Sequence, residues 1–212
     1  MTTTTLSIVL PIFPGFTALD AIGPYEVLRM LPGAQVVLAG SERGVVRSDS
    51  GVIGLHADAT YDEITSADIL VHPGGFGTRA LMKDESMLEW VRAIDATTQW
   101  TTSVCTGSLV LAAAGLLDGL DATTHWGQAE LLEKNGARYT AERVVRRGKI
   151  VTAAGVSSGI DMALTLAALI AGEDVAKAIQ LAIEYDPQPP FDAGSPAKAG
   201  QAIIDVHNTV LK

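Results

Sequence analysis

The sequence contains one cysteine, and it stands where a nucleophile could work. Cys105 follows a β-type run at residues 101–104 and precedes a helical stretch rich in Leu and Ala at residues 108–117. A side chain on such a sharp strand-to-helix turn is lifted out of the sheet and faces the positive end of the helix dipole. The dipole and the nearby N–H groups favour the thiolate, which is the nucleophilic form of cysteine. The alternative is that Cys105 is a small buried apolar residue, as most single cysteines are.

A carboxyl group that could transfer protons lies early in the chain. Asp20 is flanked by apolar residues in the run A-L-D-A-I-G. Burial would favour its neutral form, and a protonated Asp beside a thiolate could donate a proton and then act as a base. The competing interpretation is that Asp20 is the N-cap of a helix that carries Pro24 in its first turn.

A glycine-rich turn at residues 72–77, H-P-G-G-F-G, could bring backbone N–H groups close to a ligand. Glycine tolerates the unusual dihedral angles that such an approach needs, and the N–H groups could stabilise an anion forming on a substrate. The turn lacks the lysine of a P-loop and the G-x-G-x-x-G spacing, so phosphate binding is not predicted. A tight turn without a site role is the alternative. Thr106 could orient a substrate or a water molecule, or could simply begin a helix.

His125, in the run T-T-H-W, is the obvious candidate for a Cys–His pair. A histidine beside a tryptophan is more often a structural residue, and nothing in the sequence places His125 near Cys105. We therefore expect His125 to pack beside Trp126, to share a hydrogen bond there and to be dispensable for catalysis. The other histidines show no metal-ligand spacing, so we predict no metal site.

Apolar runs alternate with helical patterns over most of the chain. Strands are predicted at residues 6–10, 35–39, 68–71 and 101–104, with a hairpin at 144–147 and 150–153 and a smaller hairpin or loop at 43–58. Helices are predicted between them, including a helical stretch at 79–96, and a last helix is predicted at 198–210. This order is typical of a parallel α/β sandwich, here a single domain over residues 1–212. Ligands bind beyond the carboxyl ends of such strands, so Asp20, the glycine turn and Cys105 are expected to converge.

The composition excludes several classes of function. Hydrophobic residues make up 48% of the chain, enough for a sizeable core, and the formal net charge of −9 argues against nucleic-acid binding. One cysteine rules out an internal disulfide and a cysteine-based zinc site. The N-terminus lacks the pattern of a signal peptide, and no apolar run reaches the roughly 18 residues of a membrane span. We expect a cytoplasmic protein with no membrane partner.

Several segments together resemble the ThiJ/PfpI superfamily, which is related to the class I glutamine amidotransferases. They are D-I-L-V-H-P-G-G-F-G, S-V-C-T-G-S-L-V-L-A-A-A-G-L-L-D-G, A-T-T-H-W, E-R-V-V-R-R-G-K-I-V-T-A-A-G-V-S-S-G-I-D and E-Y-D-P-Q-P-P-F-D-A-G-S-P. Within the superfamily the chain most resembles the isocyanide hydratases. That similarity rests on C-T-G at the turn, on L-D-x-x-G-P near the N-terminus and on the proline-rich segment.

The resemblance implies a homodimer of flavodoxin-like three-layer α/β/α sandwiches that needs no cofactor or metal. It implies that Cys105 is the nucleophile, Asp20 the acid and base, and Thr106 a polar helper, with backbone N–H donors from Gly75 and Thr106. The reaction implied is addition of water to an isocyanide, which gives an N-substituted formamide through a cysteine-bound thioimidate. Thr106 stands where PfpI-type proteases carry His, which argues against protease and His-dependent glyoxalase chemistry.

Two other functions remain open from the sequence. One is a non-catalytic sensor of a small molecule or of oxidation, with Cys105 as a redox-labile thiol. The same A-T-T-H-W and C-T-G patterns resemble the sensor domains of some transcription regulators, although 212 residues leave no room for a helix-turn-helix module. The other is hydrolysis of a different substrate that forms a thioimidate, such as a nitrile.

Overall fold

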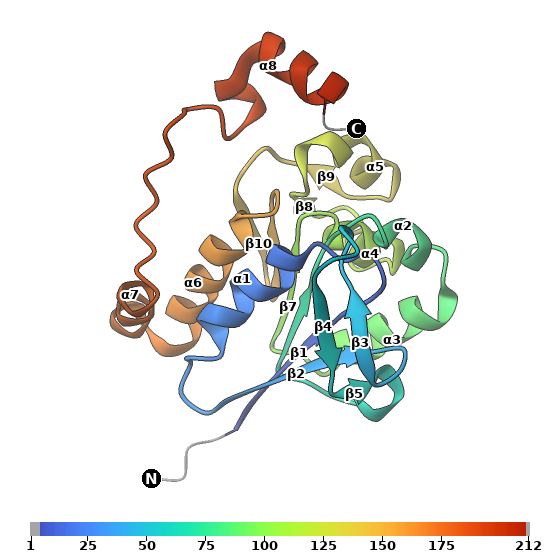
Figure 1. Cartoon of the computed structure of the whole chain (residues 1–212). Helices are drawn as coiled ribbons and strands as arrows, with labels where there is room; N and C mark the ends of the chain where they lie inside the picture. The colour runs from blue at the N-terminus through green and yellow to red at the C-terminus, as the bar shows by residue number, and fades with distance from the viewer. Residues whose placement is uncertain (1–4, 211–212) are drawn as a thin grey trace.

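The computed structural model of the protein describes residues 5–210, and a seven-stranded sheet lies at its centre (Figure 1). The order across the sheet is β10-β11-β7-β6-β1-β2-β5. Neighbouring strands are parallel, except that β10 and β11 form an antiparallel hairpin. The strands are β1 (Leu6–Pro11), β2 (Ala34–Gly40), β5 (Ala59–Thr60), β6 (Ile69–His72), β7 (Trp100–Val104), β10 (Val144–Arg147) and β11 (Ile150–Ala153). The mostly parallel sheet confirms the predicted α/β class.

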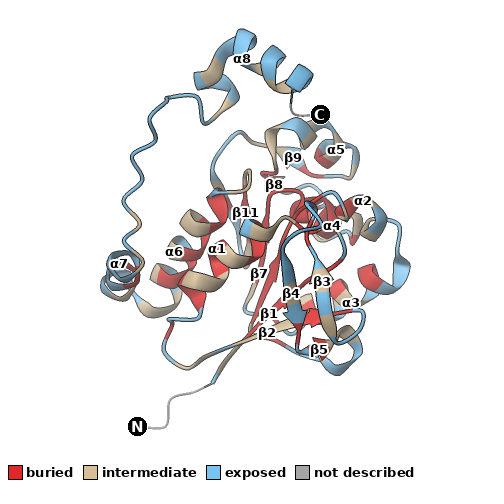
Figure 2. Cartoon of the chain, viewed as in Figure 1, coloured by how far each residue is buried: buried red, intermediate tan, exposed pale blue. Residues whose placement is uncertain are grey.

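Helices cover both faces of the sheet and complete three layers (Figure 1). On one face lie α1 (Ala18–Leu28), α6 (Ser158–Ala171) and α7 (Glu173–Ala182), and on the other α2 (Thr78–Leu81), α3 (Glu85–Asp95), α4 (Gly107–Ala113) and α5 (Ala129–Lys134). The layers follow from the side-chain alternation of the strands. In β6, Ile69 and Val71 face the first layer while Leu70 faces the second. Buried residues therefore concentrate along the sheet and on the helix faces against it (Figure 2).

The smaller elements lie around this sandwich. A two-stranded hairpin, β3 (Gly44–Arg47) and β4 (Gly54–Ala57), confirms the hairpin expected at residues 43–58. The short strands β8 (Asp121–Ala122) and β9 (Arg138–Tyr139) pair in parallel, and single 3-10 turns are η1 (Tyr61–Glu63) and η2 (Trp126–Gln128). The hairpin predicted at residues 144–147 and 150–153 is present with those bounds.

Two helical predictions are wrong in their boundaries. Helix α1 begins at Ala18, so Pro24 lies inside the helix rather than in its first turn. The helical stretch predicted from residue 79 to 96 is divided into α2 and α3, because Asp84 caps α3 by accepting hydrogen bonds from the backbone N–H groups of Ser86 and Met87.

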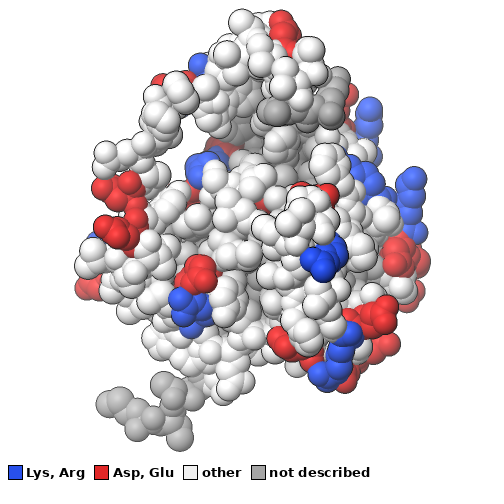
Figure 3. Space-filling model, viewed as in Figure 1, with Lys and Arg blue, Asp and Glu red and all other residues white. Residues whose placement is uncertain are grey.

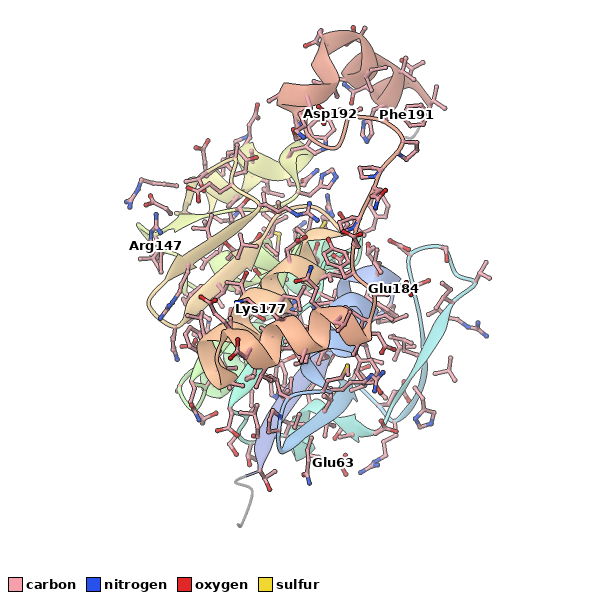
Figure 4. All side chains as sticks on the ribbon, turned by 90° about the vertical axis from the view of Figure 1, so that its left-hand side faces the viewer. Glu63, Arg147, Lys177, Glu184, Phe191 and Asp192 are labelled. Carbon is pink, nitrogen blue, oxygen red and sulfur yellow. The ribbon has the colours of Figure 1, made fainter. Side chains whose placement is uncertain are left out.

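The chain ends in a helix carried on an extended arm. Residues 184–195 run from the end of α7 to α8 (Pro196–Val210), past Phe191 and Asp192 (Figure 4). Helix α8 is bent at Gly200, where φ is 71°, and none of its residues is buried. None of the helices in the described part of the chain is both long and apolar enough to cross a membrane.

Candidate active site

Cys105 occupies a strained turn between β7 and α4. Its φ is 54°, in the left-handed region that non-glycine residues seldom adopt, which costs on the order of 1–3 kcal/mol. The Cys105 N–H donates to the carbonyl groups of Ala153 and Ala154, at 3.1 and 2.8 Å. The turn is therefore fastened to the carboxyl end of β11, and the sharp strand-to-helix geometry predicted for Cys105 is confirmed.

Two hydroxyl groups and one glycine hold this turn in place. Ser108 and Thr124 each donate a hydrogen bond of 3.0 Å to the Cys105 carbonyl. At Gly107 a Cβ atom would lie only 2.2 Å from the carbonyl oxygen of His72. The backbone of β6 and the start of α4 thus approach too closely for any side chain, which brings the end of β6 against the cysteine turn.

Asp20 is completely buried and makes its hydrogen bond to the glycine turn. Its Oδ2 accepts from the Gly74 N–H at 3.0 Å, while its Oδ1 has no hydrogen-bond partner. The N-cap of α1 is Thr17, so the interpretation of Asp20 as a helix cap is wrong. A buried carboxyl group with one free oxygen is equipped to exchange a proton.

The glycine turn brings Asp20 and Thr106 together. A Cβ atom at Gly74 would lie 2.6 Å from the Thr106 nitrogen and 2.7 Å from Asp20 Oδ2. Only glycine at position 74 allows Asp20 and Thr106 to approach each other this closely. The convergence predicted from topology is therefore observed.

Thr106 and Gly75 are hydrogen-bonded to each other. The Gly75 N–H donates to Thr106 Oγ1 at 2.9 Å, and the Thr106 hydroxyl lies 3.2 Å from the Gly75 carbonyl. The Gly75 N–H is thus already engaged. The backbone N–H groups that lower the pKa of the Cys105 thiol are those of Thr106 and Val156. Sequence reasoning missed Val156, although its turn, A-A-G-V-S-S, follows β11 at the same edge of the sheet.

Burial sets the protonation of the two reactive groups. Burial raises the pKa of Asp20 to about 7, while the Gly74 N–H and the neighbouring Cys105 side chain lower it and the charge of Asp49 adds a smaller rise. Burial, followed by the charge of Asp20, raises the pKa of the Cys105 thiol to about 12. The hydrogen bonds from Thr106 and Val156 lower the thiol pKa but do not outweigh burial. The prediction that the turn favours a free thiolate is therefore wrong.

A cavity of about 690 Å³ opens above Cys105, within the size range of small-molecule sites. Parts of the chain that are distant in sequence form its wall, including the β3–β4 hairpin, the glycine turn, η2 and α8. The lining residues are Thr17, Asp49, Gly75, Phe76, Arg79, Cys105, Thr106, His125, Trp126, Gly127, Gln128, Val156, His207 and Asn208. The carboxyl ends of the strands therefore provide the reactive groups, and the peripheral elements provide the wall.

His125 lies on the wall of this cavity, which sequence reasoning did not foresee. Its ring centroid is 5.6 Å from that of Trp126, and its Nδ1 accepts a hydrogen bond from the Gly127 N–H at 3.2 Å. The expected packing and hydrogen bond are confirmed. Within residues 5–210, no cluster of three or more His, Cys, Asp or Glu side chains is arranged to hold a metal ion.

Comparison with known proteins places the chain in a family. The sequence pattern of the DJ-1/PfpI family matches residues 6–169, well over half of the chain. The chain belongs to the DJ-1/PfpI family. The resemblance to ThiJ/PfpI proteins is thereby confirmed, together with the flavodoxin-like fold that it implied.

Individual DJ-1/PfpI relatives differ in their described roles. The chain is 46% identical to a protein named isonitrile hydratase from Pseudomonas putida, over 92% of this chain and 85% of the relative. A crystal structure of a ThiJ/PfpI family protein from Pseudomonas syringae superposes with a TM-score of 0.91 at 36% identity, covering 98% of this chain and 88% of that one. A third relative, the HTH-type transcriptional regulator CdhR from Pseudomonas aeruginosa, is 27% identical over 78% of this chain and 51% of the regulator.

Proposed function

We propose that this protein is an isocyanide hydratase, a hydro-lyase that converts R–N≡C and water into an N-substituted formamide. The observation that carries the proposal is the close approach of the buried Asp20 carboxyl group to the Cys105 turn at Gly74, where Asp20 and Cys105 also affect each other's pKa. The 46% identity to a relative named isonitrile hydratase supports the same reaction. Thr106 follows the cysteine, so the reaction does not rely on an imidazole at that position.

In the first step the sulfur and the proton of the Cys105 thiol both add to the terminal carbon of the isocyanide. The Asp20 carboxylate takes the thiol proton while the sulfur forms its bond to carbon, and Asp20 returns that proton to the same carbon. The product is a thioimidate, R–N=CH–S, bound to Cys105. Hydrogen bonds from the Thr106 and Val156 N–H groups stabilise the developing thiolate.

In the second step water hydrolyses the thioimidate. Asp20, ionised again, accepts a proton from water as the water oxygen attacks the thioimidate carbon, and Asp20 passes this proton to the nitrogen. The tetrahedral intermediate collapses when Asp20 accepts the hydroxyl proton and the C–S bond breaks, and Asp20 then passes that proton to the leaving sulfur. The formamide leaves, and Asp20 and Cys105 return to their starting states.

The test is an assay of the purified protein with an alkyl isocyanide. The proposal predicts catalytic formation of the matching N-alkyl formamide, and loss of that activity in a folded Cys105→Ser variant, because the serine hydroxyl is far harder to deprotonate. The proposal would be refuted if the wild-type protein formed no formamide from any of the alkyl isocyanides tested.

A second candidate is a non-catalytic sensor of a small molecule or of oxidation, and the match to the regulator CdhR favours it. The chain spans about half of that regulator's length. A sensor would bind an isocyanide without releasing formamide, or would respond to peroxide. The high thiol pKa works against peroxide sensing, because the thiolate is the form that is oxidised.

Hydrolysis of a nitrile is the third candidate. The same assay with a nitrile in place of the isocyanide tests it, because turnover of the nitrile alone would favour this candidate.

We further propose that the protein is a homodimer and cytoplasmic. Apolar side chains on α7 and the arm support self-association, since Leu181 and Phe191 are 80% and 79% exposed. Light scattering during size-exclusion chromatography tests the dimer, and a single species with the mass of one chain would contradict it.

A further inference from the structure

Arg79 presents a positive charge to the cavity without an acidic partner. The chain carries 24 acidic against 15 basic side chains, so carboxylates are plentiful. Even so, no carboxylate of residues 5–210 lies within 4.0 Å of the Arg79 guanidinium, although it lines the cavity above Cys105. On the face shown in Figure 3, blue Lys and Arg side chains are interspersed with red Asp and Glu side chains. An unpaired guanidinium on a cavity wall is available to an anion.

The guanidinium of Arg79 is oriented by the same turn that contacts the reactive residues. Its Nη1 donates to the Gly75 carbonyl at 3.2 Å, and its charge lies 5.6 Å from the centroid of the Phe76 ring. Gly75 in turn donates its N–H to Thr106, the residue next to the nucleophile. Arg79 and Cys105 also line the same cavity of about 690 Å³, so one small substrate in it can contact both.

Charges of opposite sign lie at different parts of the cavity wall. Asp49 accepts a hydrogen bond of 2.6 Å from the Thr17 hydroxyl, and its charge acts on Asp20. Burial lowers the pKa of His125, and the positive charges of His207 and Arg79 lower it further. The lowered pKa favours the neutral form of His125, so the guanidinium of Arg79 is the group on this wall that can hold an anion.

We propose that this wall selects isocyanides that carry a carboxylate close to the isocyanide nitrogen, with Arg79 binding the carboxylate. Guanidinium and carboxylate groups match in geometry and can form two parallel hydrogen bonds. The Cys105 sulfur receives the isocyanide carbon while Phe76 and Trp126 cover the short segment between the two ends. This inference rests on the proposed function and specifies its substrate class.

The experiment separates binding from turnover. Isothermal titration measures the affinity of the wild-type protein for N-formylglycine, the product expected from isocyanoacetate, and for its neutral amide. We expect roughly tenfold or tighter binding of the carboxylate, because hydrogen bonds to charged groups contribute more than neutral ones. Arg79→Gln should abolish this preference, and Arg79→Lys should retain part of it. Lys83→Gln, which removes a nearby exposed charge outside the cavity, should leave the preference intact.

Each outcome bears on one of the two proposals. Equal affinity for the acid and the amide, no measurable binding of the acid, or a preference that persists in Arg79→Gln would overturn the role of Arg79. A preference that depends on Arg79 together with no turnover of isocyanoacetate or of an alkyl isocyanide would support the anion site and refute the hydratase. If isocyanoacetate is hydrated, Arg79→Gln should lower its kcat/KM more than that of a neutral isocyanide, by a factor similar to the lost binding preference.

Discussion

The N–H of Gly74 donates a hydrogen bond of 3.0 Å to Oδ2 of Asp20 and joins the first helix of the fold to the turn after β6. The contact fixes one carboxyl oxygen and leaves Oδ1 without a partner. It also contributes a fixed dipole at a group whose pKa burial raises to about 7. The protonated and ionised forms of this carboxyl group are therefore both populated at neutral pH, which suits a group that must both donate and accept a proton.

Asp20→Asn is expected to lower kcat by about 10²–10⁴-fold. The amide oxygen can still accept the Gly74 hydrogen bond, but the amide cannot exchange the proton that both chemical steps require. Steady-state kinetics with an alkyl isocyanide measures the loss. A variant with kcat close to that of the wild type would remove Asp20 from the mechanism.

The stability of the same variant provides the control. The pKa of Asp20 is higher in the folded protein than its ordinary value of 3.8, so its contribution to stability is full below about pH 4 and is lost as the pH rises through about 7. The difference between these two pKa values corresponds to a loss on the order of 4 kcal/mol in the free energy of unfolding of the wild-type protein. Asp20→Asn should escape that loss, so its free energy of unfolding should change less than the wild-type value between pH 4 and pH 8.

The pH dependence of kcat/KM is expected to have its acidic limb near pH 7. The active state of the pair holds one proton between Asp20 and Cys105, and this state is populated between pKa values of about 7 and about 12. Activity should therefore rise with pH up to about 7 and then form a plateau. A profile that is flat from pH 5 to pH 8 would contradict the pKa assigned to Asp20.

Gly74→Ala is expected to reduce activity at least tenfold, because the new methyl group would displace Thr106 or Asp20 from positions within 2.7 Å. Gly194→Ala is the matched control, since its Cβ would meet no atom within 4 Å and activity should be unchanged. Both are measured with the same isocyanide after folding is verified by circular dichroism. Equal activity of the two variants would show that the close approach at Gly74 is unimportant.

His125→Ala is expected to keep kcat within about tenfold of the wild type, below the roughly 10²-fold cost of losing a general acid or base. Its Nδ1 already accepts the Gly127 N–H, and the proposed steps need no imidazole. Because His125 lines the cavity, KM is free to rise. Single-turnover kinetics at saturating isocyanide measures the chemical steps, and a loss as large as that of Asp20→Asn would mean that the base is misassigned.

The sequence predicts the sandwich and the convergence of Cys105, Asp20 and the glycine turn well, because both depend on local patterns. Apolar runs mark the buried strands, and parallel strands bring their carboxyl ends to one edge. The glycine turn at residues 72–77 and the strand-to-helix turn at Cys105 are predicted from the order of residue types, although their roles stay open at that stage. The N-terminal boundary of α1 is harder to predict, because a proline inside a helix usually marks its first turn.

The cavity wall and the protonation states are not predictable in this way. His125, Arg79 and His207 come from three separate segments, and their meeting depends on how short turns and the arm before α8 pack. The thiol pKa depends on the sum of burial, the Asp20 charge and hydrogen bonds from Thr106 and Val156. The N–H groups expected from the sequence account only for the hydrogen bonds among these contributions, and burial outweighs those hydrogen bonds.

The most direct test of covalent catalysis is intact-protein mass spectrometry of a single turnover, quenched at successive times after mixing with an alkyl isocyanide. The account predicts that the protein gains the mass of one isocyanide, that peptide mapping places the gain on Cys105, and that the adduct decays at the rate at which formamide appears. Formamide released with no adduct at any time, and at an undiminished rate by Cys105→Ser, would contradict it.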